Sequence, residues 1–160
     1  MQIKILRKDL YPKGPQFATI GSCAIDLICT KCISLDPGET KLVGTGLAAW
    51  IGSETIDLAG LVLPRSGLGN KGLILGNTVG LIDADYQGEI KVSAYNRTTT
   101  DIIIVREGQR FAQMCFVPMV QPNFEVVEDF EEATERGAGG FGSTGKGEVW
   151  LNSWEDADTE

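Results

Sequence analysis

The chain has 160 residues, of which 42% are hydrophobic and 22% charged, and its net charge at neutral pH is −8. A chain of this length is expected to form one domain with a core that needs no disulfide or metal. The acidic balance, without a cluster of Lys and Arg, argues against nucleic-acid binding, and no apolar run is long enough to cross a membrane. No signal-peptide core follows the basic residues near the N-terminus, so we expect a cytoplasmic protein.

Short strands dominate the predicted structure. Alternating or briefly continuous apolar residues, bounded by turn residues, are typical of β-strands. Strands are expected at residues 3–7, 24–28, 40–51, 58–63, 73–75, 89–96, 102–105 and 109–117. The pattern is clearest where Ile90, Val92 and Ala94 alternate with polar residues. Many short strands at close spacing predict an all-β protein, an antiparallel sandwich or barrel.

The remaining segments define three parts of the chain. A short helix is expected at residues 66–70, inside a β-rich core of residues 1–128. Residues 129–145 form an acidic linker and a glycine-rich arm, which we expect to be mobile in the free protein. Residues 146–160 form an acidic tail whose Trp150 and Trp154 suggest docking on a neighbouring surface.

The cysteines and the absence of histidine narrow the chemistry. Cys29 and Cys32 form the one CxxC pair among four cysteines, whereas zinc sites usually need two such pairs or added histidines. Reduced cysteines acting as small hydrophobic residues are the better interpretation. Without histidine the chain lacks the commonest general base and any Ser/His or Cys/His pair. Hydrolysis by this chain must therefore rest on carboxylates.

Two polar turns are candidates for that chemistry. Asp83 and Asp85 lie in a predicted hairpin, either as ordinary turn residues that bond backbone N–H groups or as carboxylates that take a proton from water. The segment Pro64-Arg-Ser-Gly67 follows a buried strand. It is either a simple strand-ending turn or an anion cradle made of a guanidinium, a hydroxyl and a close backbone N–H.

Polar residues within the strands give further candidates. Asp26 stands in an apolar strand, where burial without a partner would be costly, so it serves either a function or a structural ion pair. Arg110 and Gln113 are an odd number of positions apart in one strand, which predicts that they face opposite sides.

The glycine-rich arm contains two misleading motifs. Residues 137–142 fit GxGxxG and residues 140–146 fit most of a P-loop, but neither has the strand before it or the helix after it that these motifs require. The arm is therefore either a flexible linker or a cover for phosphates. The role as a phosphate cover is favoured by the guanidinium, the aromatic face and the two hydroxyls that the arm offers, which come from Arg136, Phe141, Ser143 and Thr144.

Five segments, taken in order, resemble the five motifs of the trimeric dUTPase family. They are Ala24-Ile-Asp-Leu27, Pro64-Arg-Ser-Gly-Leu-Gly69, Gly80-Leu-Ile-Asp-Ala-Asp-Tyr-Gln-Gly88, Arg110-Phe-Ala-Gln-Met114 and Arg136-Gly-Ala-Gly-Gly-Phe-Gly-Ser-Thr-Gly145. Single motifs are weak, but five in this order are specific, so the functional interpretations displace the structural ones. The resemblance implies a jelly-roll-like subunit, or distorted β-barrel, that assembles as a homotrimer with active sites shared among the chains. It implies hydrolysis of dUTP to dUMP and pyrophosphate with Mg²⁺.

The resemblance also implies a role for individual residues. Asp83 would activate the water that attacks the α-phosphorus, and Tyr86 would pack beneath the deoxyribose. Asp26 would reach Mg²⁺ through water. The other implied substrate-binding residues are Asn77, Gly80, Leu81 and Ile82 for uracil; Arg65, Ser66, Gly67 and Gln113 for the phosphates; Lys91 for a further substrate contact; and Arg136, Phe141, Gly142, Ser143 and Thr144 from the arm.

The chain departs from the family pattern at three places, and two alternatives remain open. Cys23-Ala24 stands where the family usually has Ala-Gly, residues 70–74 are one residue shorter than is common, and the tail after Gly145 is longer. A dCTP deaminase would share the fold, although it normally carries a glutamate in the equivalent hairpin. A nucleotide-binding regulatory protein would use the acidic tail, which is expected to dock on a neighbouring subunit.

Overall fold

The protein is described by a computed structural model that covers residues 1–52 and 58–140. The chain divides into two units, Met1–Gln121 and Pro122–Glu160. Among the described residues, no helix has both the length and the apolar character that crossing a membrane requires. In the described part of the second unit, residues 122–140, the backbone has a few bends and one turn at residues 137–138, without helix or strand.

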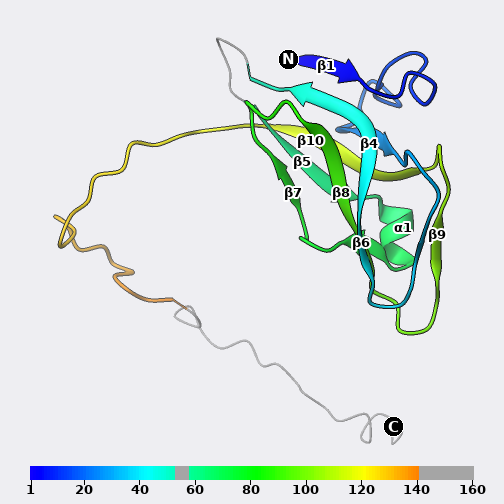
Figure 1. The fold of residues 1–160 in the computed structure, drawn as a ribbon. Helices are drawn as coiled ribbons and strands as arrows, with labels where there is room; N and C mark the ends of the chain where they lie inside the picture. The colour runs from blue at the N-terminus through cyan, green and yellow to red at the C-terminus, as the bar shows by residue number, and fades with distance from the viewer. Residues whose placement is uncertain (53–57, 141–160) are drawn as a thin grey trace, which may run out of the picture. The chain divides into compact units, whose positions relative to one another are not determined.

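The first unit is built from antiparallel β-sheets (Figure 1). One four-stranded sheet has the order β1-β4-β8-β6, and a second has the order β2-β10-β5-β7. A third sheet pairs β3 with β9. The elements are β1 (Gln2–Ile5), β2 (Ala24–Ile28), β3 (Ile33–Leu35), β4 (Thr40–Trp50), β5 (Leu58–Pro64), α1 (Ser66–Asn70), β6 (Leu73–Leu75), β7 (Gly80–Ile82), β8 (Glu89–Asn96), β9 (Ile103–Val105) and β10 (Arg110–Pro118). Every strand predicted from sequence is present, and β3 and β7 are additional.

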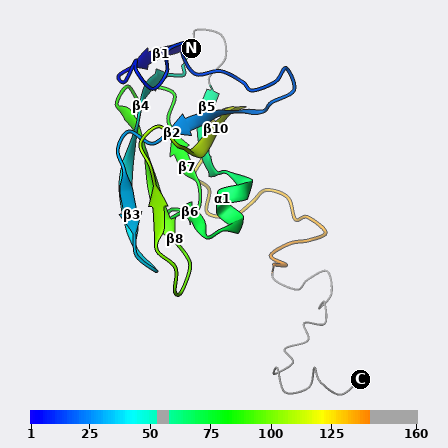
Figure 2. The same cartoon turned by 90° about the vertical axis from the view of Figure 1, so that its right-hand side faces the viewer.

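Both four-stranded sheets contribute to one hydrophobic core. The alternation predicted for β8 is observed, since Ile90, Val92 and Ala94 are all buried. Leu27 from β2 and Met114 from β10 are also fully buried in the same cluster. Figure 2 shows β2, β10 and β5 running alongside one another, with α1 following β5. The all-β fold is therefore confirmed, and the core fixes β2, β5 and β10 as a rigid support for their outward side chains.

Two buried polar residues connect the strands to loops. The Asn96 amide donates to the backbone oxygens of Leu35 (3.0 Å) and Asp101 (2.7 Å), and its oxygen accepts from the Thr98 N–H and hydroxyl. The Tyr11 hydroxyl donates to the Thr45 carbonyl (3.0 Å) and accepts from the Ile28 N–H (2.9 Å). Tyr11 thereby connects the end of β2 to β4. Both residues have the hydrogen-bond partners that burial of a polar group requires.

Candidate active site

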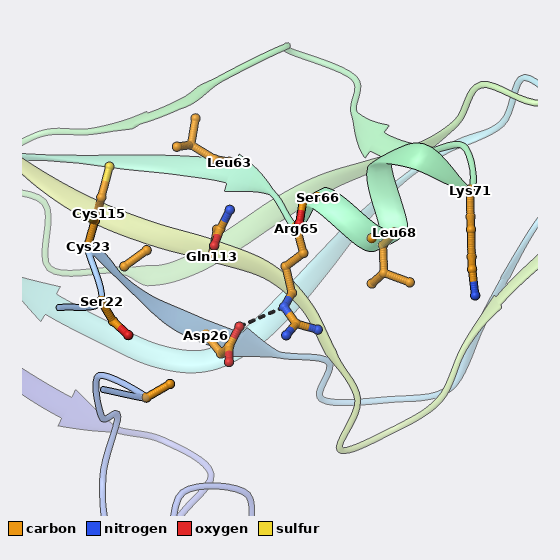
Figure 3. A pocket seen from close by; sticks show the side chains of 13 residues that line it. Ser22, Cys23, Asp26, Leu63, Arg65, Ser66, Leu68, Lys71, Gln113 and Cys115 are labelled. Carbon is orange, nitrogen blue, oxygen red and sulfur yellow. Dashed lines mark ion pairs between the residues drawn. The ribbon is translucent and has the colours of Figure 1, made fainter. Parts of the chain in front are cut away.

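A pocket of about 690 Å³ opens on the outward face of the sheet that contains β2, β10 and β5. Alternation along the strands places Ala24 and Asp26 on this face, next to Gln113 and Cys115 of β10. The loop from β5 into α1 closes one side (Figure 3). The lining residues are Ala18, Ser22, Cys23, Ala24, Asp26, Leu63, Arg65, Ser66, Gly67, Leu68, Lys71, Gln113 and Cys115.

Asp26 is the anionic centre of this pocket, and two arginines contact it. Arg65 Nε lies 2.8 Å from Asp26 Oδ1, and the Arg110 guanidinium lies 3.1 Å from Oδ2. The two side chains of the first pair point toward each other in Figure 3. Arg65 also donates to the backbone oxygen of Arg110 at 3.3 Å. An ion pair was one of the two alternatives expected for Asp26, and the structure shows it with two cations, Arg65 just before α1 and Arg110 at the start of β10.

The phosphate-binding candidates of the second and fourth motifs converge on the same pocket. Ser66 and Gly67 are exposed at the start of α1, directly after Arg65. The Gln113 side-chain amide donates to the Pro64 carbonyl at 2.9 Å, which holds it against the end of β5. Lys71, which the sequence did not single out, adds a second cation to the lining, beside Arg65. The pocket therefore combines hydroxyl, amide and cationic groups of the kind that bind phosphate.

A β-bulge corrects one prediction, that Arg110 and Gln113 face opposite sides of their strand. In the pairing of β10 with β2, Arg110 lies opposite Ile28 and Gln113 opposite Asp26, with an irregularity between Arg110 and Ala112. Because a bulge inserts an extra residue, it shifts the alternation by one position. Arg110 and Gln113 consequently lie on the same face, and both reach the surroundings of Asp26. The simple odd-spacing rule was wrong here.

The second group of candidates lies in residues 77–88, which contain β7 and which we continue to call the hairpin. The hairpin prediction was wrong in its strand pairing, because β7 pairs with β5 while the following strand, β8, lies in the other four-stranded sheet. Ile82 pairs with Gly60 and Gly80 with Val62, and the exposed Asp83 comes immediately after the strand. A Cβ on Gly80 would lie 3.0 Å from the Val62 Cβ, so the two backbones approach closely. The Asp83 carbonyl accepts from the Tyr86 N–H at 3.2 Å, which closes the turn.

The rest of this hairpin is held by backbone contacts. The Tyr86 hydroxyl donates to the Glu89 carbonyl at 3.1 Å, which fixes a ring that is 43% exposed. The exposed Asn77 precedes Thr78, whose positive φ of 66° marks a strained turn. The Val79 N–H bonds back to the Asn77 carbonyl at 2.7 Å. The hairpin therefore presents Asn77, Asp83 and Tyr86 to solvent from a constrained backbone.

One chain does not bring the pocket and the hairpin together. Arg65 follows the C-terminal end of β5, whereas β7 runs antiparallel to β5 and carries Asp83 toward its N-terminal end. No described residue of the hairpin lines the pocket.

Lys91 lies exposed in the middle of β8, in the other four-stranded sheet. Arg136 lies in the second unit and bonds locally to Gly139. Phe141, Gly142, Ser143 and Thr144 lie outside the described residues.

Comparison with known proteins identifies the family to which these features belong. A family model described as dUTPase matches residues 13–145. The chain belongs to the dUTPase family. It is 51% identical to a deoxyuridine 5'-triphosphate nucleotidohydrolase of Francisella tularensis subsp. novicida, covering 91% of this chain and 98% of that protein. It is 49% identical to one from Psychrobacter sp., covering 91% and 97%. These matches confirm the predicted family and the predicted enzyme class, a dUTP diphosphatase of nucleotide metabolism.

Solved dUTPase structures show the same fold. The dUTPase of Staphylococcus bacteriophage 80alpha, solved with dUPNHPP, has a TM-score of 0.79 at 27% identity, covering 91% of this chain and 98% of that one. A mutant dUTPase from phage phi11 of S. aureus, described as revealing the coordination of a structural Mg(II) ion, has a TM-score of 0.71 at 23% identity, covering 82% of this chain and 98% of that one. The predicted jelly-roll-like fold of the dUTPase family is thus confirmed.

The donor atoms at the pocket limit how this dUTPase could hold a metal. Within residues 1–52 and 58–140, no three His, Cys, Asp or Glu side chains are grouped to form a metal cage. Asp26 is the single carboxylate among the described residues that line the pocket. Mg²⁺ retains several waters and is commonly bound through one or two carboxylates plus substrate phosphates. The residues present therefore fit a hydrated Mg²⁺ carried by a phosphate ligand, with Asp26 contacting it through water.

Proposed function

We propose that this dUTPase family member hydrolyses dUTP to dUMP and pyrophosphate, at sites completed between three copies of the chain. One observation carries the proposal. A cationic pocket around Arg65 and a constrained hairpin with an exposed Asp83 belong to the same chain but lie at opposite ends of β5. Each is half of a nucleotide site, and a rotational assembly of identical chains supplies the missing half.

The hairpin would select the nucleoside and activate the water. Because Gly80 packs closely on Val62, the backbone of residues 80–82 forms a narrow wall that can bond the uracil edge together with Asn77. Tyr86, anchored through its hydroxyl, would offer its ring to the deoxyribose. Asp83 would take a proton from water while the water oxygen bonds to the α-phosphorus. The bond from that phosphorus to the bridging oxygen then breaks, and pyrophosphate leaves.

The pocket would bind the triphosphate. Arg65, Ser66, Gly67 and Gln113 surround one cavity and offer donors to anionic oxygens. Bound Mg²⁺ would neutralise charge that builds up on the phosphates during cleavage. Asp26 would orient its water shell. We further propose that Lys91 makes an additional substrate contact, and that an arm from another copy covers the nucleotide through Arg136, Phe141, Gly142, Ser143 and Thr144.

Turnover of purified protein tests the activity. With Mg²⁺, dUTP should release pyrophosphate, with little turnover of dTTP, dCTP or UTP. The Asp83→Asn variant should bind dUTP but lose turnover, because its amide cannot accept the proton. Asp85→Asn, with the same charge change in the same turn, should retain most activity. Absence of dUTP turnover by folded protein would refute the proposal, and ammonia release from dCTP would support the deaminase alternative.

Mixed assemblies test whether sites are shared between chains. Asp83→Asn and Arg65→Gln should each be inactive alone. If the hairpin and the pocket of a site come from different chains, equal mixing by unfolding and refolding restores about a quarter of the sites. Each restored site takes its hairpin from the Arg65→Gln chain and its pocket from the Asp83→Asn chain. Failure to regain activity in mixtures of the expected trimer mass would show that each site lies within one chain.

A further inference from the structure

The Asp26 carboxylate holds two guanidinium groups in the nucleotide-free protein. Arg65 contacts one oxygen at 2.8 Å and Arg110 the other at 3.1 Å. Because each arginine engages a separate oxygen, one carboxylate fixes both side chains. A phosphate group could take the place of this carboxylate, because guanidinium groups bind the oxygens of either anion.

The position of Asp26 places this cluster between two cavities. Asp26 lines the larger pocket together with Arg65 and Lys71. It also lines a neighbouring pocket of about 270 Å³, which Arg110 and Lys13 border as well. A small movement of either guanidinium away from the carboxylate would leave it beside one of these cavities. The formal charges of Asp26, Arg65, Arg110 and Lys71 sum to +2, so the cluster still favours an anionic ligand.

The exposure of the three side chains makes the ion pairs exchangeable. Asp26 is 26% exposed, Arg65 36% and Arg110 60%. Ion pairs that retain this much solvent contact are weak, because water screens them and holding long side chains costs entropy. A polyphosphate, with several negative charges and more acceptor oxygens than one carboxylate, would compete successfully for both arginines.

We propose that Asp26 is an internal competitor for phosphate: it positions Arg65 and Arg110 in the free protein and releases both to the polyphosphate of the ligand. This makes Arg110 a further phosphate-binding residue. The inference rests on the proposed nucleotide function. It adds a step to the contact of Asp26 with hydrated Mg²⁺, because the carboxylate becomes free for the metal only after the phosphate has taken its arginines.

The two roles of Asp26 predict opposite effects of one substitution. In EDTA, full-length Asp26→Asn should bind inorganic tripolyphosphate about three- to tenfold more tightly than the wild type, because the competing charge is gone. With Mg²⁺ present this advantage should shrink or reverse, since the carboxylate that orients the metal is lost. Isothermal titration calorimetry measures both affinities. Glu39→Gln, which removes one negative charge at the Glu39–Lys41 pair outside the pocket lining, should bind tripolyphosphate as the wild type does.

The Arg110→Gln variant tests the second arginine. It should weaken metal-free tripolyphosphate binding, and the loss should be larger in an Asp26→Asn background, where Arg110 is free from the start. Metal-free affinity that is equal or lower in folded Asp26→Asn would overturn the inference, as would unchanged binding by both Arg110→Gln variants. These outcomes are independent of catalysis, whereas the proposed function fails if folded wild-type protein does not hydrolyse dUTP.

Discussion

Replacing Tyr11 by Phe would remove a hydroxyl that joins β2 to β4. Tyr11 is 4% exposed, and its hydroxyl bonds the Ile28 N–H at 2.9 Å and the Thr45 carbonyl at 3.0 Å. Ile28 lies two positions after Asp26 on β2, so the contact also fixes the strand that carries the anionic centre. The substitution leaves both backbone groups without this partner while preserving the aromatic ring.

The size of the effect follows from these two contacts and from pH. Each buried group that loses its partner costs about 1 to 3 kcal/mol, so for two groups we expect a loss of about 2 to 6 kcal/mol at pH 8. Burial raises the pKa of the Tyr11 hydroxyl from 10.0 to about 12. The unfolded chain therefore ionises first, and the wild type loses stability as pH rises from 10 toward 12. At pH 11 that loss is about 1.4 kcal/mol, and the Phe variant does not incur it.

Urea unfolding at pH 8 and pH 11 checks both numbers. Protein concentration must be fixed, because subunit assembly adds to apparent stability. The difference in unfolding free energy between wild type and Tyr11→Phe should narrow by about 1.4 kcal/mol at the higher pH. Other ionising groups are common to both proteins and cancel in this difference. A gap of the same size at both pH values, or a Phe variant as stable as the wild type at pH 8, would refute the reasoning.

Three further predictions concern packing, the hairpin and the thiols. Asn96→Ala should lower the unfolding free energy by about 3 kcal/mol in urea titrations, because Asn96 is fully buried and its amide bonds two carbonyls. Gly80→Ala should raise KM for dUTP, because the new Cβ would displace the hairpin from Val62. Unchanged KM and kcat would contradict the proposal that the close packing of Gly80 on Val62 shapes the uracil site. Cys32 is exposed, whereas Cys29 is buried and burial raises the pKa of its thiol, so iodoacetamide should label Cys32 before Cys29, as mass spectra of the peptides would show.

The sequence predicted the fold well because hydrophobic alternation is a local signal. Residues 89–96 indicated β8 through their period-two pattern, and the structure reproduces it. The strands β3 and β7 were missed because β3 has Ser34 at its centre and β7 begins with Gly80, whereas the equally short β6 and β9 are continuous apolar runs. Burial of Asn96 was not predictable either, since its acceptors, Leu35 and Asp101, come from segments brought together only by folding.

Motif order predicted which residues line the pocket better than it predicted how they contact one another. Motif order nominated Asp26, Arg65 and Gln113, and the structure gathers these three at one pocket. The approach of Arg110 to Asp26 required knowledge of a bulge, which no residue pattern in the strand revealed. Lys71 is absent from the predicted set because it follows α1 as an ordinary surface lysine, and only the return of the chain toward β6 places it on the pocket wall.

The separation of Asp83 from Arg65 has a simple origin in strand direction. Arg65 directly follows β5, and Asp83 directly follows β7. Because these two strands pair in opposite directions, the two residues lie at opposite ends of the strand pair. No adjustment of loops in one chain reverses this, because the register of β5 with β7 is fixed by Gly60, Val62 and their partners inside the sheet. If dUTP contacts both groups, as we propose, a site needs two copies of the chain, and assembly is then required for catalysis. The proposed role of Asp26 is consistent with such an assembly, because its ion pairs with Arg65 and Arg110 would hold both guanidinium groups in place until a phosphate binds.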